Sequence, residues 1–347
     1  MTTRDTDPKP RPLPKKPGAV TMTTVGRMAG VSQVTVSRAL SDPSKVSPET
    51  LKRIHEAIEA TGFVPNALAG ALASRRSNLI TALVPSITNI VYSSLLHGFA
   101  EIMRQHGYQI MVSEIGFDAA REQEMIATHL ARRPDGILLT GIHHSPEARR
   151  MLIGAAIPVV EVWDVTETPI DCCIGFSHHE VGRAGAEFAL DAGYRRAATV
   201  TAGDLRAQRR RDAFIARYQS RDSGPVARID FPPGTATLGQ GRDALARLID
   251  EHGFTGGVIF CSSDQFAHGI LTEAISRGLS VPQDIAVIGF GDQAFAEHTF
   301  PPLTTIRVDR DALGREAANA LLARFDGGAE GPGTIDLGFT LIRRGSA

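Results

Sequence analysis

The 347-residue chain contains no stretch of 18 consecutive apolar residues, which excludes an apolar transmembrane helix. Cysteine is scarce: the adjacent Cys172 and Cys173 and the distant Cys261 match neither a disulfide framework nor a zinc-site spacing. No apolar segment follows the basic N-terminus, so the sequence predicts no signal peptide. We therefore expect a cytoplasmic protein whose cysteines are small buried side chains. No GxSxG motif or nucleophile–base pattern occurs, and the sequence predicts no catalysis.

Charge is nearly balanced overall, with 37 Lys and Arg against 38 Asp and Glu, but it is distributed unequally. Residues 1–78 hold 12 basic and 6 acidic side chains, whereas the remainder holds 25 basic and 32 acidic ones. A small basic segment attached to an acidic body is typical of a nucleic-acid-binding module joined to a second domain.

The pattern of apolar residues divides the chain into four parts. Residues 1–21 hold five prolines among lysines and arginines, which predicts a disordered tail. Residues 22–65 predict three short helices, and residues 66–77 a further short helix. From residue 78 to 347, short apolar strands alternate with amphipathic helices, which predicts parallel α/β sheets. The eight or nine repeats exceed one open sheet, so we expect two lobes. Residues 303–325 would return to the first lobe, and 339–345 would complete the second.

The three-helix segment begins with a helix-turn-helix pattern. Val25, Met28 and Ala29 give the first helix an apolar face. Gly30 supplies the positive φ of the turn, and Ser32 caps the next helix.

The second helix is predicted to run from Gln33 to Leu40. It would bury Val36 and Leu40 and turn Gln33, Val34, Ser37 and Arg38 outward. Ser47 followed by Pro48 starts a third helix, which ends at Gly62.

The strings AGVSxxTVSRxL and VSPETLKRIHEAIEATGFVPN resemble the lac-repressor (LacI/GalR) family, and the resemblance extends from Thr23 to about Arg344. It implies a sequence-specific DNA-binding regulator, acting as a repressor, with its second helix in the major groove. Gln33, Val34 and Arg38 would read bases, with a phosphate contact as the alternative for Arg38. Ser32, Thr35 and Ser37 would contact phosphates or cap helices.

The resemblance also implies that residues 66–77 form a hinge helix that orders on the operator. Asn66, Ala69 and Leu72 would lie at the DNA, with Leu72 wedged into the minor groove and Ala69 allowing a close approach of the partner's hinge. A plain linker is the alternative. No coiled segment follows Arg344, which favours a homodimer on a near-palindromic operator.

For the body, the resemblance implies a periplasmic-binding-protein-like pair of lobes with a small-molecule effector between them. The rule that ligands bind at the carboxyl ends of parallel strands selects the same loops. Arg210 would clamp the effector, with Arg206 and Arg209 close by. The full predicted set is Ser86, Tyr92, Glu161, Trp163, Phe176, Arg210, Ser263, Asp264 and Asp292. Trp163 and Phe176 are alternatively core residues, and Asp264 a helix cap.

Two departures from the family's sugar-binding pattern bear on the effector. Gly291 stands where an acid is expected, with Asp292 one residue later, and Ser263 replaces an amide. Together with the arginine-rich loop, they favour a ligand that carries a carboxylate. PSITN, IPVVEVWD and DLGFTL look most like the gluconate-utilisation repressors, which implies a sugar acid such as gluconate.

Two other classes of protein share parts of this pattern. The body alone would suit a solute-binding protein for transport, but the basic head and the missing signal peptide speak against it. Gly289, Gly291 and Ala294 mimic a dinucleotide-binding fingerprint, but Pro301 and Pro302 cut short the helix that such a site requires. Neighbouring histidines at 143–144 and 178–179 lack metal-site spacing. We therefore expect neither a cofactor nor a metal.

Overall fold

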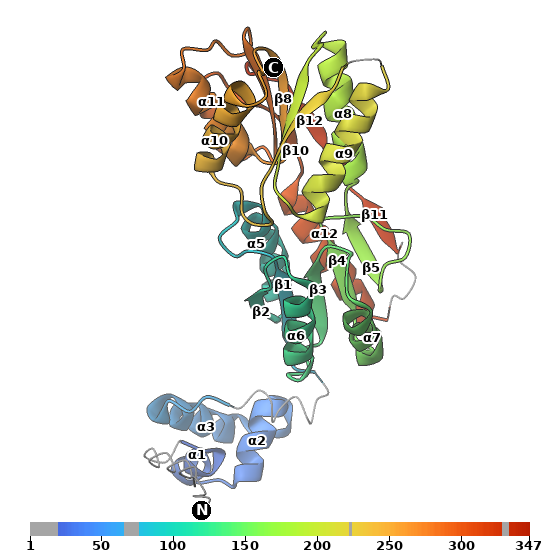
Figure 1. The fold of residues 1–347 in the computed structure, drawn as a ribbon. Helices are drawn as coiled ribbons and strands as arrows, with labels where there is room; N and C mark the ends of the chain where they lie inside the picture. The colour runs from blue at the N-terminus through green and yellow to red at the C-terminus, as the bar shows by residue number, and fades with distance from the viewer. Residues whose placement is uncertain (1–19, 66–75, 222–223, 328–332) are drawn as a thin grey trace, which may run out of the picture. The chain divides into compact units, whose positions relative to one another are not determined.

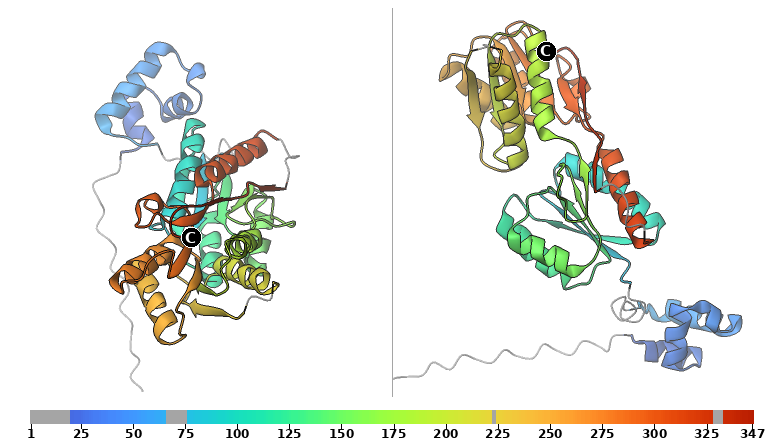
Figure 2. Two further views of the ribbon diagram at one scale, coloured as in Figure 1. Left: turned by 90° about the horizontal axis from the view of Figure 1, so that it is seen from above. Right: turned by 90° about the vertical axis from the view of Figure 1, so that its right-hand side faces the viewer.

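The computed structural model describes residues 20–65, 76–221, 224–327 and 333–347. The chain divides into two compact units, Met1–Ser77 and Asn78–Ala347, which we call the head and the sensor domain. Figure 1 and Figure 2 show the elements of each unit. The predicted hinge residues Asn66, Ala69 and Leu72 lie outside the described residues and remain predictions.

The described part of the head contains the three predicted helices. The side chains of Ser32 and Ser47 cap two of them by accepting the backbone N–H three residues further on. Gly30 and Gly62 end two of them in the left-handed conformation, with φ of 67° and 62°. The elements are α1 (Met22–Ala29), α2 (Gln33–Ser41), the 3₁₀ turn η1 (Pro43–Lys45) and α3 (Pro48–Thr61).

The three helices of the head enclose a small apolar core. It includes Val25, Ala29, Val36, Ala39, Ile54, Ala57 and Phe63. The prediction that Met28 shares the apolar face of α1 with Val25 and Ala29 is wrong, because Met28 is 59% exposed. The inward stripe of α1 follows Met22, Val25, Gly26 and Ala29, which are spaced three and four residues apart, and Met28 lies outside that stripe.

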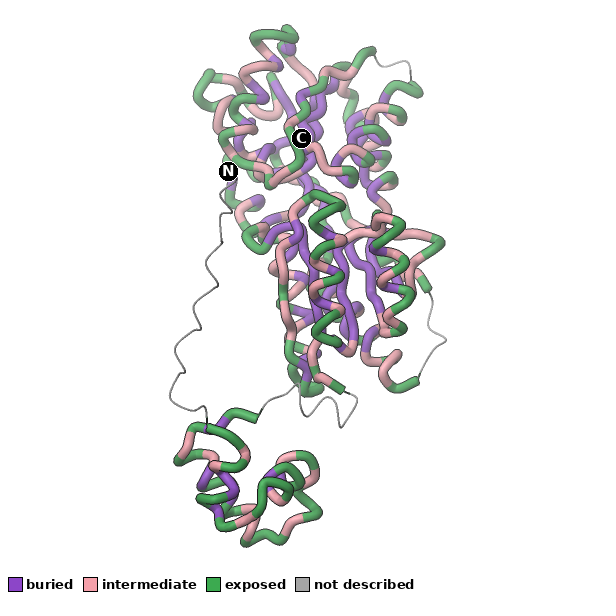
Figure 3. The backbone as a smooth tube through the Cα atoms, turned by 60° about the horizontal axis from the view of Figure 1, so that its bottom comes forward, coloured by how far each residue is buried: buried purple, intermediate pink, exposed green. Residues whose placement is uncertain are grey.

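The first lobe of the sensor domain is a parallel six-stranded sheet with the order β11-β5-β4-β3-β1-β2. Its strands are β1 (Leu79–Val84), β2 (Gln109–Glu114), β3 (Gly136–Thr140), β4 (Val159–Val162), β5 (Cys172–Gly175) and β11 (Thr334–Asp336). Its helices are α5 (Ile90–Gln105), α6 (Ala119–Leu130), α7 (Pro146–Ala155) and α12 (Arg310–Phe325). Strands β3, β4 and β5 are buried throughout, as expected for a parallel sheet covered by helices (Figure 3).

The second lobe is a six-stranded sheet with the order β12-β10-β9-β8-β6-β7, in which only β12 is antiparallel to its neighbour. Its strands are β6 (Ala197–Thr201), β7 (Val226–Asp230), β8 (Gly257–Cys261), β9 (Ile285–Phe290), β10 (Thr304–Arg307) and β12 (Thr340–Ile342). Its helices are α8 (His178–Asp191), α9 (Leu205–Gln219), α10 (Leu238–Asp250), α11 (Asp264–Ser276) and the turn η2 (Ala296–His298).

The chain passes between the lobes after β5, after β10 and again between β11 and β12 (Figure 1). Helix α12 leaves the second sheet to pack against α5 of the first lobe. The predicted return of residues 303–325, and the completion of the second sheet by residues 339–345, are therefore confirmed. Loops at the strand ends of both lobes can consequently face one cleft.

The three cysteines are free and buried, as predicted. Within the described residues, no helix is long and apolar enough to cross a membrane.

Candidate DNA-reading helix and effector cleft

Helix α2 presents a polar face away from the core of the head. Val36 and Ala39 are buried beneath it, while Gln33, Ser37 and Arg38 are exposed and Val34 is 65% exposed. This is the outward set predicted from the sequence. Thr35 is half-buried and shares a 2.9 Å hydrogen bond with the hydroxyl of Ser32, which caps the helix.

The turn before α2 allows only a small residue where the two helices meet. A Cβ atom on Gly26 would lie 2.8 Å from the carbonyl oxygen of Val31, too close for any side chain. The Thr23 hydroxyl of α1 donates a 3.0 Å hydrogen bond to the amide oxygen of Gln33. These contacts fix α2 against α1 and leave the Gln33 amino group available to a partner.

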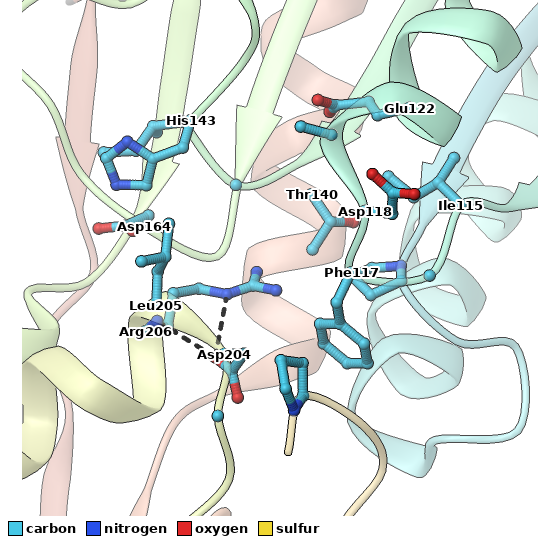
Figure 4. A pocket seen from close by; sticks show the side chains of 17 residues that line it. Ile115, Phe117, Asp118, Glu122, Thr140, His143, Asp164, Asp204, Leu205 and Arg206 are labelled. Atoms are coloured by element: carbon cyan, nitrogen blue, oxygen red, sulfur yellow. Dashed lines mark hydrogen bonds and ion pairs between the residues drawn. The ribbon is translucent and has the colours of Figure 1, made fainter.

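Two adjoining cavities lie between the lobes of the sensor domain. The inner cavity has a volume of about 60 Å³ and is lined by residues that include Tyr92, Trp163, Arg210 and Ser263. The outer cavity, of about 340 Å³, is lined by residues that include Glu122, Thr140, His143 and Asp164 (Figure 4). Phe117, Asp204 and Arg206 line both cavities, so the two form one continuous cleft.

The inner cavity therefore brings together four of the predicted residues, namely Tyr92, Trp163, Arg210 and Ser263. Ser86, Glu161, Phe176, Asp264 and Asp292 line neither cavity. Ser86 is buried near the cleft and shares a hydrogen bond with Thr88.

Arg206 is the residue of α9 that both cavities share. Its Nη2 donates a 3.1 Å hydrogen bond to the hydroxyl of Tyr92, which reaches from the other lobe. Its Nε lies 3.9 Å from the carboxylate of Asp204. The Nη1 atom is buried and has no hydrogen-bond partner among the described residues. A buried guanidinium N–H group without an acceptor is costly, and a bound anion would satisfy it.

Arg210 lies one turn further along α9 and is held by the protein itself. Its Nη1 donates to Nδ1 of His178 at 2.8 Å, and its Nη2 donates to the carbonyl oxygen of Ser262 at 3.1 Å. The guanidinium carbon lies 3.9 Å from the centre of the Phe290 ring. Burial lowers the pKa of Arg210 to about 10. Burial and Arg210 together lower the pKa of His178 well below its ordinary value, so its neutral ring accepts this hydrogen bond.

Aromatic rings form the apolar wall of the inner cavity. Tyr92 and Phe176 each contact the Trp163 ring edge-to-face, with centroids 5.8 and 5.4 Å away. Phe176 is fully buried behind Trp163 and is a core residue, which was the alternative interpretation. Trp163 itself is buried but lines the cavity, with a positive φ of 76°.

Asp264 organises the loop that follows β9. It is fully buried and accepts hydrogen bonds from the backbone N–H of Gln293 at 2.7 Å and from the Thr305 hydroxyl at 2.5 Å. Burial raises its pKa to about 6. Through the first of these bonds it positions Gln293, which lines the inner cavity and which the sequence analysis did not select.

Asp292 points toward two arginines instead of the cleft. Its carboxylate pairs with Arg307 at 2.6 Å and with Arg344 at 2.7 Å. Although burial opposes it, this pairing lowers the pKa of Asp292. Its expected place in the effector site is therefore occupied by its neighbour Gln293.

Asp164 and Glu161 come from the same strand end but differ in their surroundings. Asp164 lines the outer cavity and pairs with Arg209 across the cleft at 3.1 Å. Burial raises its pKa. Glu161 is completely buried in the first lobe and bonded to His144. Within the described residues, no group of three or more His, Cys, Asp or Glu side chains could hold a metal ion.

An exposed polar helix on a helix-turn-helix unit, joined to a two-lobed domain with an enclosed polar cleft, defines a ligand-responsive DNA-binding regulator. Residues 21–66 match the family model described as bacterial regulatory proteins, lacI family, and residues 186–347 match the periplasmic binding protein-like domain.

Comparison with individual proteins gives the same result. The chain is 34% identical over 330 residues to the HTH-type transcriptional regulator GntR of Pseudomonas aeruginosa, covering 95% of this chain and 96% of that protein. A LacI-family regulator from Silicibacter pomeroyi has a similar structure, with a TM-score of 0.89, 31% identity, and coverage of 94% of this chain and 99% of that one.

A further structure, the lac repressor dimer bound to operator and an anti-inducer, matches with a TM-score of 0.80 and 26% identity over 95% of this chain and 99% of that one. The protein belongs to the LacI family of transcriptional regulators. It is a sequence-specific DNA-binding regulator with a two-lobed effector-sensing domain, and the family and fold predicted from the sequence are confirmed.

Proposed function

We propose that this protein is a homodimeric repressor of sugar-acid metabolism that binds a near-palindromic operator and is controlled by a sugar acid in the cleft. The observation that carries the effector class is the buried Nη1 of Arg206, on the wall of both cavities, for which the described part of the chain offers no hydrogen-bond partner. Moving a carboxylate out of water requires a charged donor in return, and a guanidinium group supplies one.

In the head, we assign base reading to Gln33, Val34 and Arg38. All three are exposed on α2, where a large rigid partner can reach them. Ser32, Thr35 and Ser37 would contact phosphates, which fix the position on the duplex. Asn66, Ala69 and Leu72 are assigned to the hinge on the family resemblance alone.

In the sensor domain, Arg206 is a better candidate for the carboxylate clamp than Arg210. Both Nη atoms of Arg210 already donate, to His178 and Ser262, and among the described residues only its Nε lacks a partner. Arg206 instead keeps a terminal Nη1 without a partner among those residues and lines both cavities. The inner cavity of about 60 Å³ is too small for a whole sugar acid, so the hydroxylated chain would extend into the outer cavity.

Control of DNA binding follows from contacts across the cleft. Tyr92 contacts Arg206, and Asp164 contacts Arg209, so both pairs join the two lobes. A ligand that replaces or strengthens these contacts favours one lobe arrangement over the other and shifts the equilibrium by its differential affinity. We assign no catalytic role to any of these residues, because the family to which the protein belongs consists of regulators.

Calorimetry on the full-length protein with gluconate and with the neutral sugar glucose tests the effector class. A charged partner on Arg206 predicts that gluconate binds at least about tenfold more tightly, since charge-assisted hydrogen bonds are roughly twice as strong as neutral ones. Equal or tighter binding of glucose would refute the sugar-acid assignment and leave the DNA-binding assignment intact.

A further inference from the structure

A buried histidine in the first lobe bridges two glutamates. Nδ1 of His144, in the β3–α7 loop, lies 2.9 Å from Oε1 of Glu122 on α6. Nε2 of the same ring lies 3.1 Å from Oε1 of Glu161 on β4. The three side chains are 2%, 8% and 0% exposed respectively. We call these three residues the acidic triad.

The acidic triad suits a protonated ring. Both ring nitrogens lie within hydrogen-bond distance of carboxylate oxygens, and a cationic imidazole can donate to both. Burial alone would lower the pKa of His144, but the hydrogen bonds to Glu122 and Glu161 outweigh burial and raise it to about 9. One cation between two carboxylates leaves the triad with a net charge of about −1.

The remaining negative charge faces the cleft through Glu122. Both oxygens of Glu161 are occupied, since Oε2 accepts the backbone N–H of Ile170 at 2.6 Å. Oε2 of Glu122 receives no hydrogen bond from the described residues, and Glu122 lines the outer cavity. Figure 4 shows Glu122 and Arg206 on the same cavity, Glu122 on α6 of the first lobe and Arg206 on α9 of the second.

We propose that Glu122 is a specificity residue of the effector site, which accepts hydroxyl hydrogen bonds from the chain of a ligand whose carboxylate binds Arg206. His144 and Glu161 are positioning residues that hold the Glu122 carboxylate in place. The inference rests on the proposed sugar-acid effector and adds the orientation of the bound ligand. Its carboxylate would contact the second lobe, and its hydroxylated end would contact the first.

This orientation disfavours a ligand that is anionic at both ends. Near Glu122 the outer cavity also carries Asp118, while Asp164 and Asp204 each lie beside an arginine, and the pKa of His143 is lowered by burial and by Arg209. A second carboxylate in the outer cavity would therefore meet like charges at short range, which costs binding energy. The site should distinguish gluconate from glucarate, which has the same carbon chain and a carboxylate at both ends.

Calorimetry on the full-length protein with these two compounds tests the assignment. The wild-type protein should bind gluconate at least about tenfold more tightly than glucarate. Glu122→Gln removes the charge with little change in shape, and should weaken gluconate binding about 10- to 100-fold, as expected for a hydrogen bond to a charged group. Glucarate binding should stay constant or strengthen. His144→Gln should move the gluconate-to-glucarate ratio in the same direction, whereas a purely structural role would weaken both compounds together.

Glu124→Gln is the matched control, because Glu124 is exposed on the same helix and lines neither cavity. It should leave both affinities unchanged. If Glu122→Gln does not fold, Glu122→Asp keeps the charge but retracts it, and should weaken gluconate binding without improving glucarate binding. Wild-type affinity for gluconate in Glu122→Gln, or equal wild-type affinities for the two compounds, would overturn the assignment while the sugar-acid effector stands. A wild-type protein that binds neither compound would refute the proposed effector itself, and the role of Glu122 with it.

Discussion

The head and the sensor domain present their binding residues in opposite ways. On α2, Gln33 and Arg38 are exposed and Val34 is 65% exposed, whereas Arg206 and Arg210 in the cleft are 8% and 5% exposed. A duplex is large and rigid, so it can reach an exposed helix, and its phosphates supply much of the affinity. A small anion in water must instead be enclosed by groups that replace its hydration. Substitutions in the head should therefore change DNA binding alone, while those in the cleft can change both ligand binding and folding.

Removal of Arg206 tests the enclosed side of this comparison and should have the largest effect. Arg206→Ala should weaken gluconate binding by about 30-fold or more, since truncating one partner of a buried charge pair costs about 2–5 kcal/mol. Operator binding without gluconate should persist. Arg206→Lys should restore little, because an ammonium group cannot reproduce the geometry of the guanidinium. Isothermal calorimetry on each full-length variant measures these affinities.

Two further arginines of α9 serve as controls for that experiment. Arg217→Ala should leave gluconate binding unchanged, because Arg217 pairs with Glu187 and lines neither cavity. Arg210→Ala should lower the melting temperature as well as the affinity, because it leaves His178 and Ser262 without their donor. If Arg206→Ala binds gluconate like the wild-type protein, the clamp is wrongly assigned.

The buried acidic triad of the sensor domain also predicts how the stability of the folded protein depends on pH. The pKa of His144 in the folded state is about 9, above its ordinary 6.5. Because the folded-state pKa is raised, the stabilisation is complete below pH 6.5 and is lost as the pH rises through about 9. The shift corresponds to on the order of 3 kcal/mol. Urea unfolding followed by fluorescence of Trp163, the one tryptophan in the sequence, should show a larger loss between pH 6.5 and 9.5 in the wild-type protein than in His144→Gln. Equal losses would contradict the charged state of the triad.

Replacement of Arg38 tests the exposed side of the comparison. Arg38→Ala should cost about 1–3 kcal/mol of operator affinity and relax the preference at one base pair in each half-site. The melting temperature and gluconate affinity should not change, because the side chain is exposed. Fluorescence anisotropy with an operator selected from random duplexes, and with a scrambled duplex, measures the difference. An equal loss on both duplexes would make Arg38 a phosphate contact.

This difference between the two regions also explains how far the sequence could predict them. The outward face of α2 follows from helical periodicity and local caps, so Gln33, Val34, Ser37 and Arg38 were placed correctly. The two-lobed fold, with its return crossing, follows from the alternation of strands and helices in the same way. Each of these features depends on residues close together in the chain.

The cleft depends on contacts between distant segments, and there the sequence was less informative. Arg206 and Arg210 lie one turn apart on α9. His178 and Ser262, more than 30 residues from Arg210, occupy both of its Nη atoms, whereas Nη1 of Arg206 has no partner among the described residues. Asp292 is diverted from the cleft by Arg307 and Arg344, and Gln293 takes its place. Glu122 has the sequence context of an exposed helix residue, since its partners His144 and Glu161 come from other elements of the first lobe.

The central claim is that the exposed helix and the enclosed cleft belong to one allosteric regulator, and the coupling between the two sites tests it most directly. Binding free energies are linked reciprocally, so a ligand that alters operator affinity must itself bind with altered affinity when operator is bound. Titration of the full-length protein with gluconate, alone and with saturating selected operator, should give dissociation constants that differ by about 5- to 150-fold. The affinity for operator should change by the same factor when gluconate is saturating. A gluconate dissociation constant that is identical with and without operator would contradict the account.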